Sequence, residues 1–239
     1  MNLSTEHLVT VAATLLVIAV LVGAARMRPG TWTVVVARTL AVIVLVNEAG
    51  WWVWLYLSHS LSPSYSLPLQ LCDVAASVTA AALWFRTPIL VELTYFWGIA
   101  GTANGLITPD ISSHFPSFSF IQYFLQHGAI VGSALFLVLG LGIAPRPWSS
   151  LRVFGLTVLL TVVDAFANLL TGGNYMYLRS PPGVRSLLNL MGPWPWYIVG
   201  AAVLALALFL LLELPFRIAD RVRARPAVEA ARQPLSGRH

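Results

Sequence analysis

The residues best able to do covalent chemistry in this chain are one cysteine and one histidine inside long apolar stretches, Cys72 and His127. A cysteine reacts as its thiolate, which a nearby base activates and the positive end of a helix stabilises. Ser66 and Pro68 are typical of a helix start, which puts Cys72 about one turn inside a helix whose backbone N–H groups point toward it. A cysteine and a histidine oriented by a third polar group form a constellation that transfers acyl groups.

Four polar residues in other apolar stretches can supply that third group, because each carries a carboxylate or an amide. They are Asp164, Glu48, Asn104 and Asn168. The residues alone do not choose among them, and our working assignment is Asp164. A structural interpretation stays open as well: a lone buried cysteine is often a small apolar core residue, and an intramembrane histidine is often structural or part of a proton relay.

The composition identifies a membrane protein and excludes several activities. Of 239 residues, 58% are hydrophobic and 10% are charged, against roughly 25% charged in soluble domains. The chain has no lysine, which excludes a Schiff base and a Gly-Lys phosphate loop. One cysteine allows no internal disulfide or multi-cysteine metal site, so we expect no cofactor and no metal. The arginines are spread along the chain, so the net charge of +5 indicates membrane topology and no nucleic-acid partner.

Seven apolar runs are each long enough to cross a hydrocarbon core of about 30 Å. They cover residues 8–25, 32–57, 67–86, 88–108, 118–142, 150–171 and 193–214. Only helices satisfy their backbone in lipid over such lengths, so the sequence predicts an all-α bundle of seven transmembrane helices. We expect this domain to occupy residues 1–216, followed by a basic, disordered cytoplasmic tail over 217–239.

The arginines predict the orientation. Five lie in the turns after the first, third and fifth runs, and six lie in the tail. The opposite side has only Arg179 and Arg185. Positive charge stays on the cytoplasmic side, so the N-terminus is expected outside and the C-terminus inside a multi-pass protein of the plasma membrane.

Counting about 1.5 Å per residue along each run places the polar groups in depth. The outer half of the membrane receives Glu48, Cys72, Asn104, His127, Asp164 and Asn168. The inner half receives Arg38 and Glu92, which we expect to form a salt bridge. Asp164 and Asn168 share one helix face with Thr157, Thr161 and Thr171, so this polar stripe is expected to face the bundle or a wet cavity.

Two small-residue motifs predict close packing of the fourth and fifth runs. These are Gly101-x-x-x-Gly105 and Gly128-x-x-x-Gly132. Buried polar groups in the outer half also fit two non-enzymatic classes, a transporter and a ligand-binding receptor or sensor. A transporter usually shows inverted repeats and interrupted helices, and neither is visible in this sequence.

Several sequence blocks resemble the YwaF-type integral membrane family. The blocks are LPLQLC at 67–72, YFWGIAG at 95–101, TPD at 108–110, QHG at 126–128, NYMYL at 174–178 and GPWPWY at 192–197. Animal relatives of this family are described as acyltransferases that place polyunsaturated acyl chains in ether phospholipids, using a cysteine and a histidine. The resemblance implies that Cys72 and His127 take these two roles.

On this resemblance, membrane lipids are the expected partners, including a phospholipid substrate. Gln70 or Asn104 would donate a hydrogen bond to the oxyanion, and Asp164 or Glu48 would orient the imidazole. Arg179 and Arg185 would meet the lipid phosphate. The acyl donor and the oligomeric state cannot be read from these residues.

Overall fold

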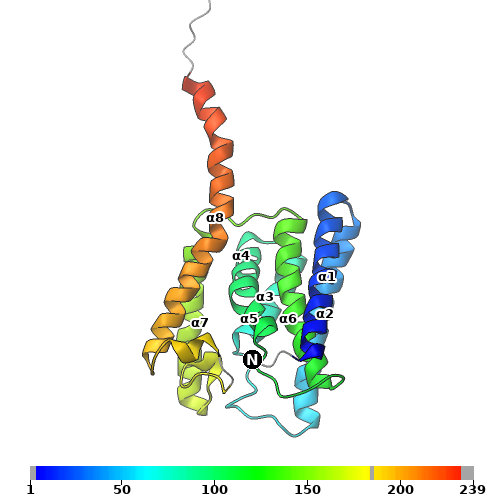
Figure 1. Ribbon diagram of the computed structural model, residues 1–239, viewed down its shortest axis with the longest axis vertical. Helices are drawn as coiled ribbons and strands as arrows, with labels where there is room; N and C mark the ends of the chain where they lie inside the picture. The colour runs from blue at the N-terminus through cyan, green and yellow to red at the C-terminus, as the bar shows by residue number, and fades with distance from the viewer. Residues whose placement is uncertain (1–3, 184–185, 233–239) are drawn as a thin grey trace, which may run out of the picture.

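The computed structural model describes residues 4–183 and 186–232, with side chains as far as Val222, and this part of the chain is helical without strands (Figure 1). The α-helices are α1 (Thr5–Met27), α2 (Trp32–Leu57), α3 (Leu71–Phe85), α4 (Pro88–Phe96), α5 (Ala103–Ile107), α6 (Phe118–Leu135), α7 (Ser149–Thr171) and α8 (Trp196–Arg232). Two π-helices, η1 (Trp97–Thr102) and η2 (Phe136–Gly140), and two 3₁₀ turns, η3 (Tyr175–Tyr177) and η4 (Leu187–Leu190), complete the set. The prediction of an all-helical protein is confirmed.

Five helices are long and apolar enough to cross a membrane. They are α1, α2, α6 with η2, α7, and α8 as far as Val222. The helix α3 is apolar but has only 15 residues, and α4, η1 and α5 follow one another without a break from Pro88 to Ile107. The protein therefore passes the membrane several times, while the count of seven spans and the orientation stay predictions.

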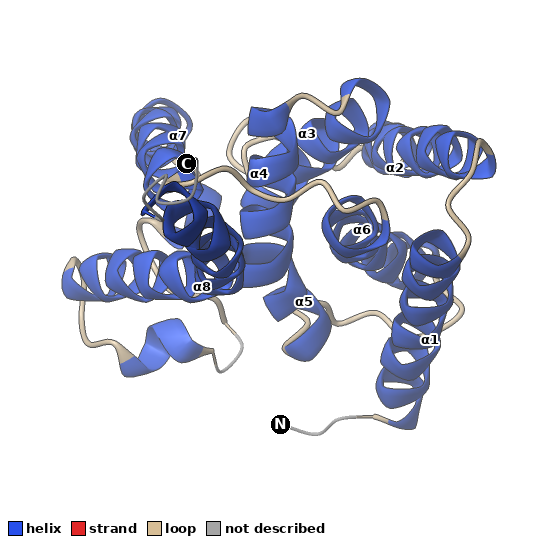
Figure 2. Ribbon diagram, turned by 90° about the horizontal axis from the view of Figure 1, so that it is seen from above, coloured by secondary structure: helices blue, strands red, loops and turns tan. Residues whose placement is uncertain are grey.

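The helices form two groups on either side of α4 (Figure 2). On one side, α6 packs against α1, α2 and α3, and also against α4 itself. On the other side, α7 pairs with α8. This division decides which polar residues can meet, because α4 and its continuation through η1 and α5 lie between the polar stripe of α7 and the histidine of α6.

Glycines allow close approaches, but of the two motifs only Gly105 packs as expected, while Gly101 faces Leu71 of α3. A side chain at Gly105 would collide with His127 of α6, which confirms the contact between the fourth and fifth runs. Gly128 and Gly132 instead face Thr14 and Ile18 of α1. The second prediction was wrong because helical phase shows that a face is small but not which helix fills the space beside it.

The expected pair of Arg38 and Glu92 does not form. Glu92, with 1% of its side chain exposed, binds Arg146 at 2.8 Å and Arg152 at 2.9 Å. Arg146 belongs to the segment that leads into α7 and Arg152 to the first turn of α7, so the carboxylate ties the start of α4 to the start of α7. Arg38 lies over the ring of Trp84, with its guanidinium carbon 5.3 Å from the ring centre.

A second buried carboxylate, Glu213, ties α8 to the same region. Its oxygens accept hydrogen bonds from the backbone N–H groups of Trp148, at 2.6 Å, and of Ser150, at 3.2 Å. They also accept one from the Ser150 hydroxyl, and Arg217 adds an ion pair at 2.9 Å. The helix then continues to Arg232 and projects beyond the others (Figure 1). Residues 217–232 are therefore helical where a disordered tail was expected.

The Glu92 cluster makes a prediction about stability. Replacing Arg146 and Arg152 together by alanine is expected to lower the free energy of unfolding by about 3 kcal/mol, because it leaves a buried carboxylate unpaired. Glu92→Leu is expected to lower it less, since the arginine side chains are 49% and 37% exposed and can turn to water. Thermal unfolding in detergent measures both effects. Arg28→Ala is the control, an exposed arginine without an ion pair among the described residues. Equal losses for the two changes would contradict the explanation.

Candidate functional site

Cys72 lies closer to a helix start than the sequence predicted. The helix α3 begins at Leu71, with Gln70 as its N-cap, so Cys72 is the second residue of the helix. The backbone N–H groups of Leu71 and Cys72 have no acceptor among the described residues. The thiol is free and half-buried, and Sγ donates to Oδ1 of Asp73 at 3.5 Å. The helix end favours a thiolate at this position, and the neighbouring carboxylate opposes it.

His127 is held by one ring nitrogen, and its other nitrogen is free. Nδ1 lies 2.8 Å from the backbone oxygen of Tyr123, and the two rings stack with centres 4.0 Å apart. A carbonyl only accepts, so Nδ1 carries the hydrogen, and a neutral imidazole then has its lone pair on Nε2. No described residue binds Nε2. His127 therefore has the tautomer that a general base needs.

The glycine face of η1 and α5 brings the two candidate residues to one region of the bundle. A Cβ at Gly101 would lie 2.7 Å from the Leu71 side chain, and a Cβ at Gly105 would lie 2.6 Å from Nε2 of His127. These glycines are one helical turn apart. The chain next to Cys72 and the imidazole of His127 thus pack one turn apart on the same surface. The thiol and the imidazole do not form a hydrogen bond to each other.

A set of hydrogen bonds closes one rim of this region. The Tyr123 hydroxyl donates to the Gly105 carbonyl at 3.1 Å and accepts from the Asp110 backbone N–H at 3.4 Å. The Tyr177 hydroxyl, from the segment after α7, donates to Asp110 Oδ2 at 2.6 Å. Burial, then this hydrogen bond and the Asp110 charge, and more weakly Tyr123 and Cys72, raise the pKa of Tyr177. These contacts place the segment around Tyr177 over the region that holds Cys72.

Gln70, the N-cap residue of α3, lies two residues before Cys72. Its Oε1 accepts a hydrogen bond from the Met176 backbone N–H at 3.1 Å, and this contact fixes the orientation of the amide, because an N–H requires an oxygen as its acceptor. The Nε2 group of Gln70 has no partner among the described residues. Sequence reasoning missed Asp110, Tyr177 and the orienting role of Tyr123, since only the folded chain brings these segments together.

Glu48 binds α6 but does not contact His127. Its carboxylate accepts hydrogen bonds from Gln126 Nε2 and, at 3.3 Å, from Trp52 Nε1. Asn47 Nδ2 donates to Gln126 Oε1 at 2.7 Å. This network joins α2 to α6 within the membrane, one residue before His127.

The structure does not bring Asp164 to His127. Asp164 is fully buried on α7, which packs against α4, η3 and α8, and neither of its carboxylate oxygens has a partner in the described chain. The polar stripe of α7 faces the bundle, as expected, since Trp97 Nε1 donates to Thr157 Oγ1 at 2.8 Å. The imidazole that Asp164 was expected to orient is bound instead by the Tyr123 carbonyl.

The remaining candidates lie away from the thiol. Asn168 holds the Tyr175 backbone, accepting from its N–H at 2.7 Å and donating to its carbonyl at 3.0 Å, which is a structural role. Asn104 is exposed, and its Oδ1 accepts from Thr108 at 3.4 Å. Arg179 is exposed in the segment after α7, where its side chain donates to the Gly173 carbonyl at 3.4 Å. Arg185 lies outside the described residues. Among the described residues, no three His, Cys, Asp or Glu side chains gather as a metal site.

A comparison with known protein families matches nearly the whole chain. The sequence model of the TMEM164 family matches residues 2–213. The chain belongs to the TMEM164 family. No curated protein and no solved structure matches it. The TMEM164 match includes Cys72, His127 and both glycines that pack beside them, and it ends within α8.

Gly105 gives a test of this packing in the TMEM164-family chain. Gly105→Ala is expected to lower the free energy of unfolding by about 1–3 kcal/mol, because the new Cβ would lie 2.3 Å from Cδ2 of His127. The hydrogen bond to Tyr123 keeps the ring from moving away. The control is Gly155→Ala, where nothing lies within 4 Å. There alanine is expected to be neutral or stabilising by up to about 1 kcal/mol, through helix propensity. Similar unfolding temperatures for both variants would contradict the packing.

Proposed function

We propose that this protein is a phospholipid acyltransferase in which Cys72 carries the acyl group and His127 moves the protons. The observation that carries the proposal is the free Nε2 of His127, fixed as a base one helical turn from the start of the cysteine helix. The YwaF-type resemblance and the relation to acyltransferases of ether phospholipids agree with it. The site also offers donors without acceptors, which acyl transfer requires.

The first step forms an acyl-enzyme. His127 Nε2 takes the thiol proton, and Cys72 Sγ attacks the carbonyl carbon of a phospholipid ester. The backbone N–H groups of Leu71 and Cys72, with Nε2 of Gln70, are the donors for the oxyanion. The C–O bond then breaks, and the imidazolium returns its proton to the departing lysophospholipid oxygen, which leaves a thioester on Cys72.

The second step transfers the acyl group. His127 Nε2 takes the proton of an acceptor hydroxyl on another lysophospholipid, whose oxygen attacks the thioester carbon. The C–S bond breaks, the proton passes to the sulfur, and the free thiol is restored. Thiol and imidazole must come into hydrogen-bond reach during this cycle, which requires a displacement at the start of α3, since the Tyr123 carbonyl holds the imidazole in place.

The proposal predicts loss of transfer in two variants. Purified protein in phosphatidylcholine vesicles is given a lysophospholipid acceptor, and mass spectrometry measures the acylated product. Cys72→Ala and His127→Ala are each expected to lower the rate at least about a hundredfold, as for removal of a nucleophile or a general base. Wild type is also expected to hold a hydroxylamine-sensitive acyl group, absent from Cys72→Ala. Unchanged rates in both variants, at equal folded amounts, would refute the function.

Asp164 gives a second prediction in the same assay. Asp164→Asn keeps the shape of the side chain and removes its charge. Since Asp164 does not contact His127, transfer is expected to stay within about twofold of wild type, or less than about 0.5 kcal/mol in the barrier. A loss as large as that of His127→Ala would show instead that Asp164 acts on the imidazole.

A further inference from the structure

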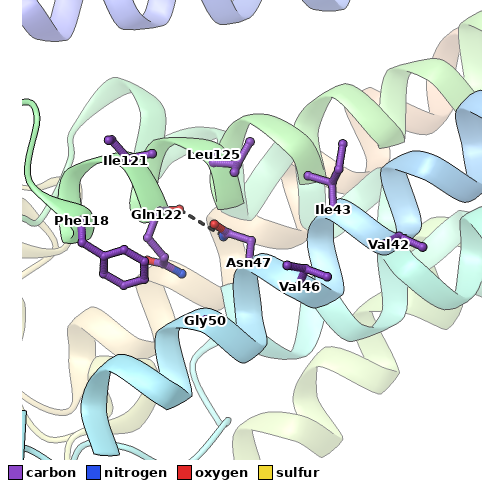
Figure 3. Close-up of a pocket in the computed structure, with 9 residues that line it drawn as sticks. All are labelled: Val42, Ile43, Val46, Asn47, Gly50, Phe118, Ile121, Gln122 and Leu125. Carbon is purple, nitrogen blue, oxygen red and sulfur yellow. Dashed lines mark hydrogen bonds between the residues drawn. The ribbon is translucent and has the colours of Figure 1, made fainter. Parts of the chain in front are cut away.

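The helices α2 and α6 leave a groove between them that the proposed chemistry does not use (Figure 3). Its volume is about 530 Å³, within the range of ligand pockets. The lining residues are Val42, Ile43, Val46, Asn47, Gly50, Phe118, Ile121, Gln122 and Leu125. All are apolar except Asn47 and Gln122, and none is charged. The groove lies along two membrane-crossing helices, so its surroundings are lipid.

One polar group in the groove has no partner. Gln122 is 9% exposed as a residue, no described residue binds its amide, and the amide atoms open to the groove. Figure 3 shows the side chain extending from α6 toward α2. The Asn47 amide, in contrast, donates to the Gln122 backbone oxygen at 3.2 Å and to Gln126 at 2.7 Å. An amide that faces lipid without a hydrogen bond is costly, so Gln122 indicates a ligand with a polar atom at this point.

The dimensions of the groove select the ligand. Residues 42–50 of α2 span about 12 Å at 1.5 Å per residue. Half of a 30 Å hydrocarbon core is about 15 Å, which is the depth that one leaflet's acyl chain fills. A neutral, apolar groove of this length with one unpartnered amide fits a chain that carries one hydrogen-bond acceptor. In a membrane lipid that acceptor is the ester carbonyl.

We infer that this groove binds an ester-linked acyl chain of a membrane lipid, with Gln122 Nε2 donating to the ester carbonyl. His127 points from the opposite face of α6 toward Gly105, so the ester at Gln122 is not the ester that reacts. The groove holds the chain that stays on the lipid while the other is transferred. The statement that this lipid is the substrate rests on the proposed function. The lipid-binding site itself does not depend on that function.

Photo-crosslinking in phosphatidylcholine vesicles tests the groove directly. The probe is a phosphatidylcholine with diazirines in its chains, in a diester and a diether form. The diester probe is expected to label residues 42–50 and 118–125 about fivefold more than the diether probe, which is one hydrogen bond of about 1 kcal/mol. Gln122→Leu is expected to abolish this preference and leave the diether labelling unchanged.

A matched pair of variants keeps the test independent of Gln122. Val46 and Val35 both lie on α2 and are 64% and 65% exposed, but only Val46 lines the groove. Val46→Phe is expected to reduce the labelling of residues 118–125, and Val35→Phe is expected to leave it unchanged. Equal labelling by both probes in wild type would overturn the inference, as would groove labelling no stronger than that of α1. A crosslink between two copies of the chain at this groove, with no labelling by the lipid probe, would also overturn the inference.

Cys72→Ser separates the groove from the proposed function, because the labelling needs no reaction at the thiol. Preferential labelling in this variant, together with unchanged transfer in Cys72→Ala, would support the lipid site in the groove and refute the cysteine mechanism. Transfer that depends on Cys72, without preferential labelling by the diester probe, would refute the lipid site in the groove and support the cysteine mechanism.

Discussion

A polar group inside the membrane has no water to bind, so it must find its partner within the protein. This constraint governs most of the contacts in this chain. Glu92 is surrounded by two arginines and Glu213 by backbone N–H groups, a serine and an arginine, and together they join the starts of α4 and α7 to α8. Partnered groups of this kind hold the two halves of the bundle together.

The same constraint gives meaning to the groups that lack a partner. The imidazole Nε2 of His127, the Gln70 amide nitrogen and the N–H groups at the start of α3 lie in one region, beside the single cysteine. In the proposed function the imidazole nitrogen serves as the base and the N–H groups serve as donors to the oxyanion. Gln122, on the other side of α6, is isolated in an apolar groove and indicates a different contact with lipid.

Small residues decide how closely these groups can approach. Gly101 and Gly105 give α3 and α6 a common surface, and any side chain there would displace Leu71 or His127. The π-helix that contains Gly101 continues directly into α5, and π-segments are frequent at functional sites. Above this surface, Asp110 and Tyr177 close the rim through side chains that are 67 residues apart in the sequence.

The sequence by itself determined that the protein is helical and lies in the membrane, because such apolar runs have no other stable form in lipid. It also singled out Cys72 and His127 as candidates, since polar residues are rare enough there to stand out one by one. Helical phase correctly turned the α7 stripe toward the bundle, yet it could not show that α4 would separate Asp164 from the histidine. For the same reason, depth paired Arg38 with Glu92, and phase placed Gly128 against the wrong helix. Depth and phase are properties of one helix, whereas a partner depends on which helix lies opposite, and only the tertiary packing decides that.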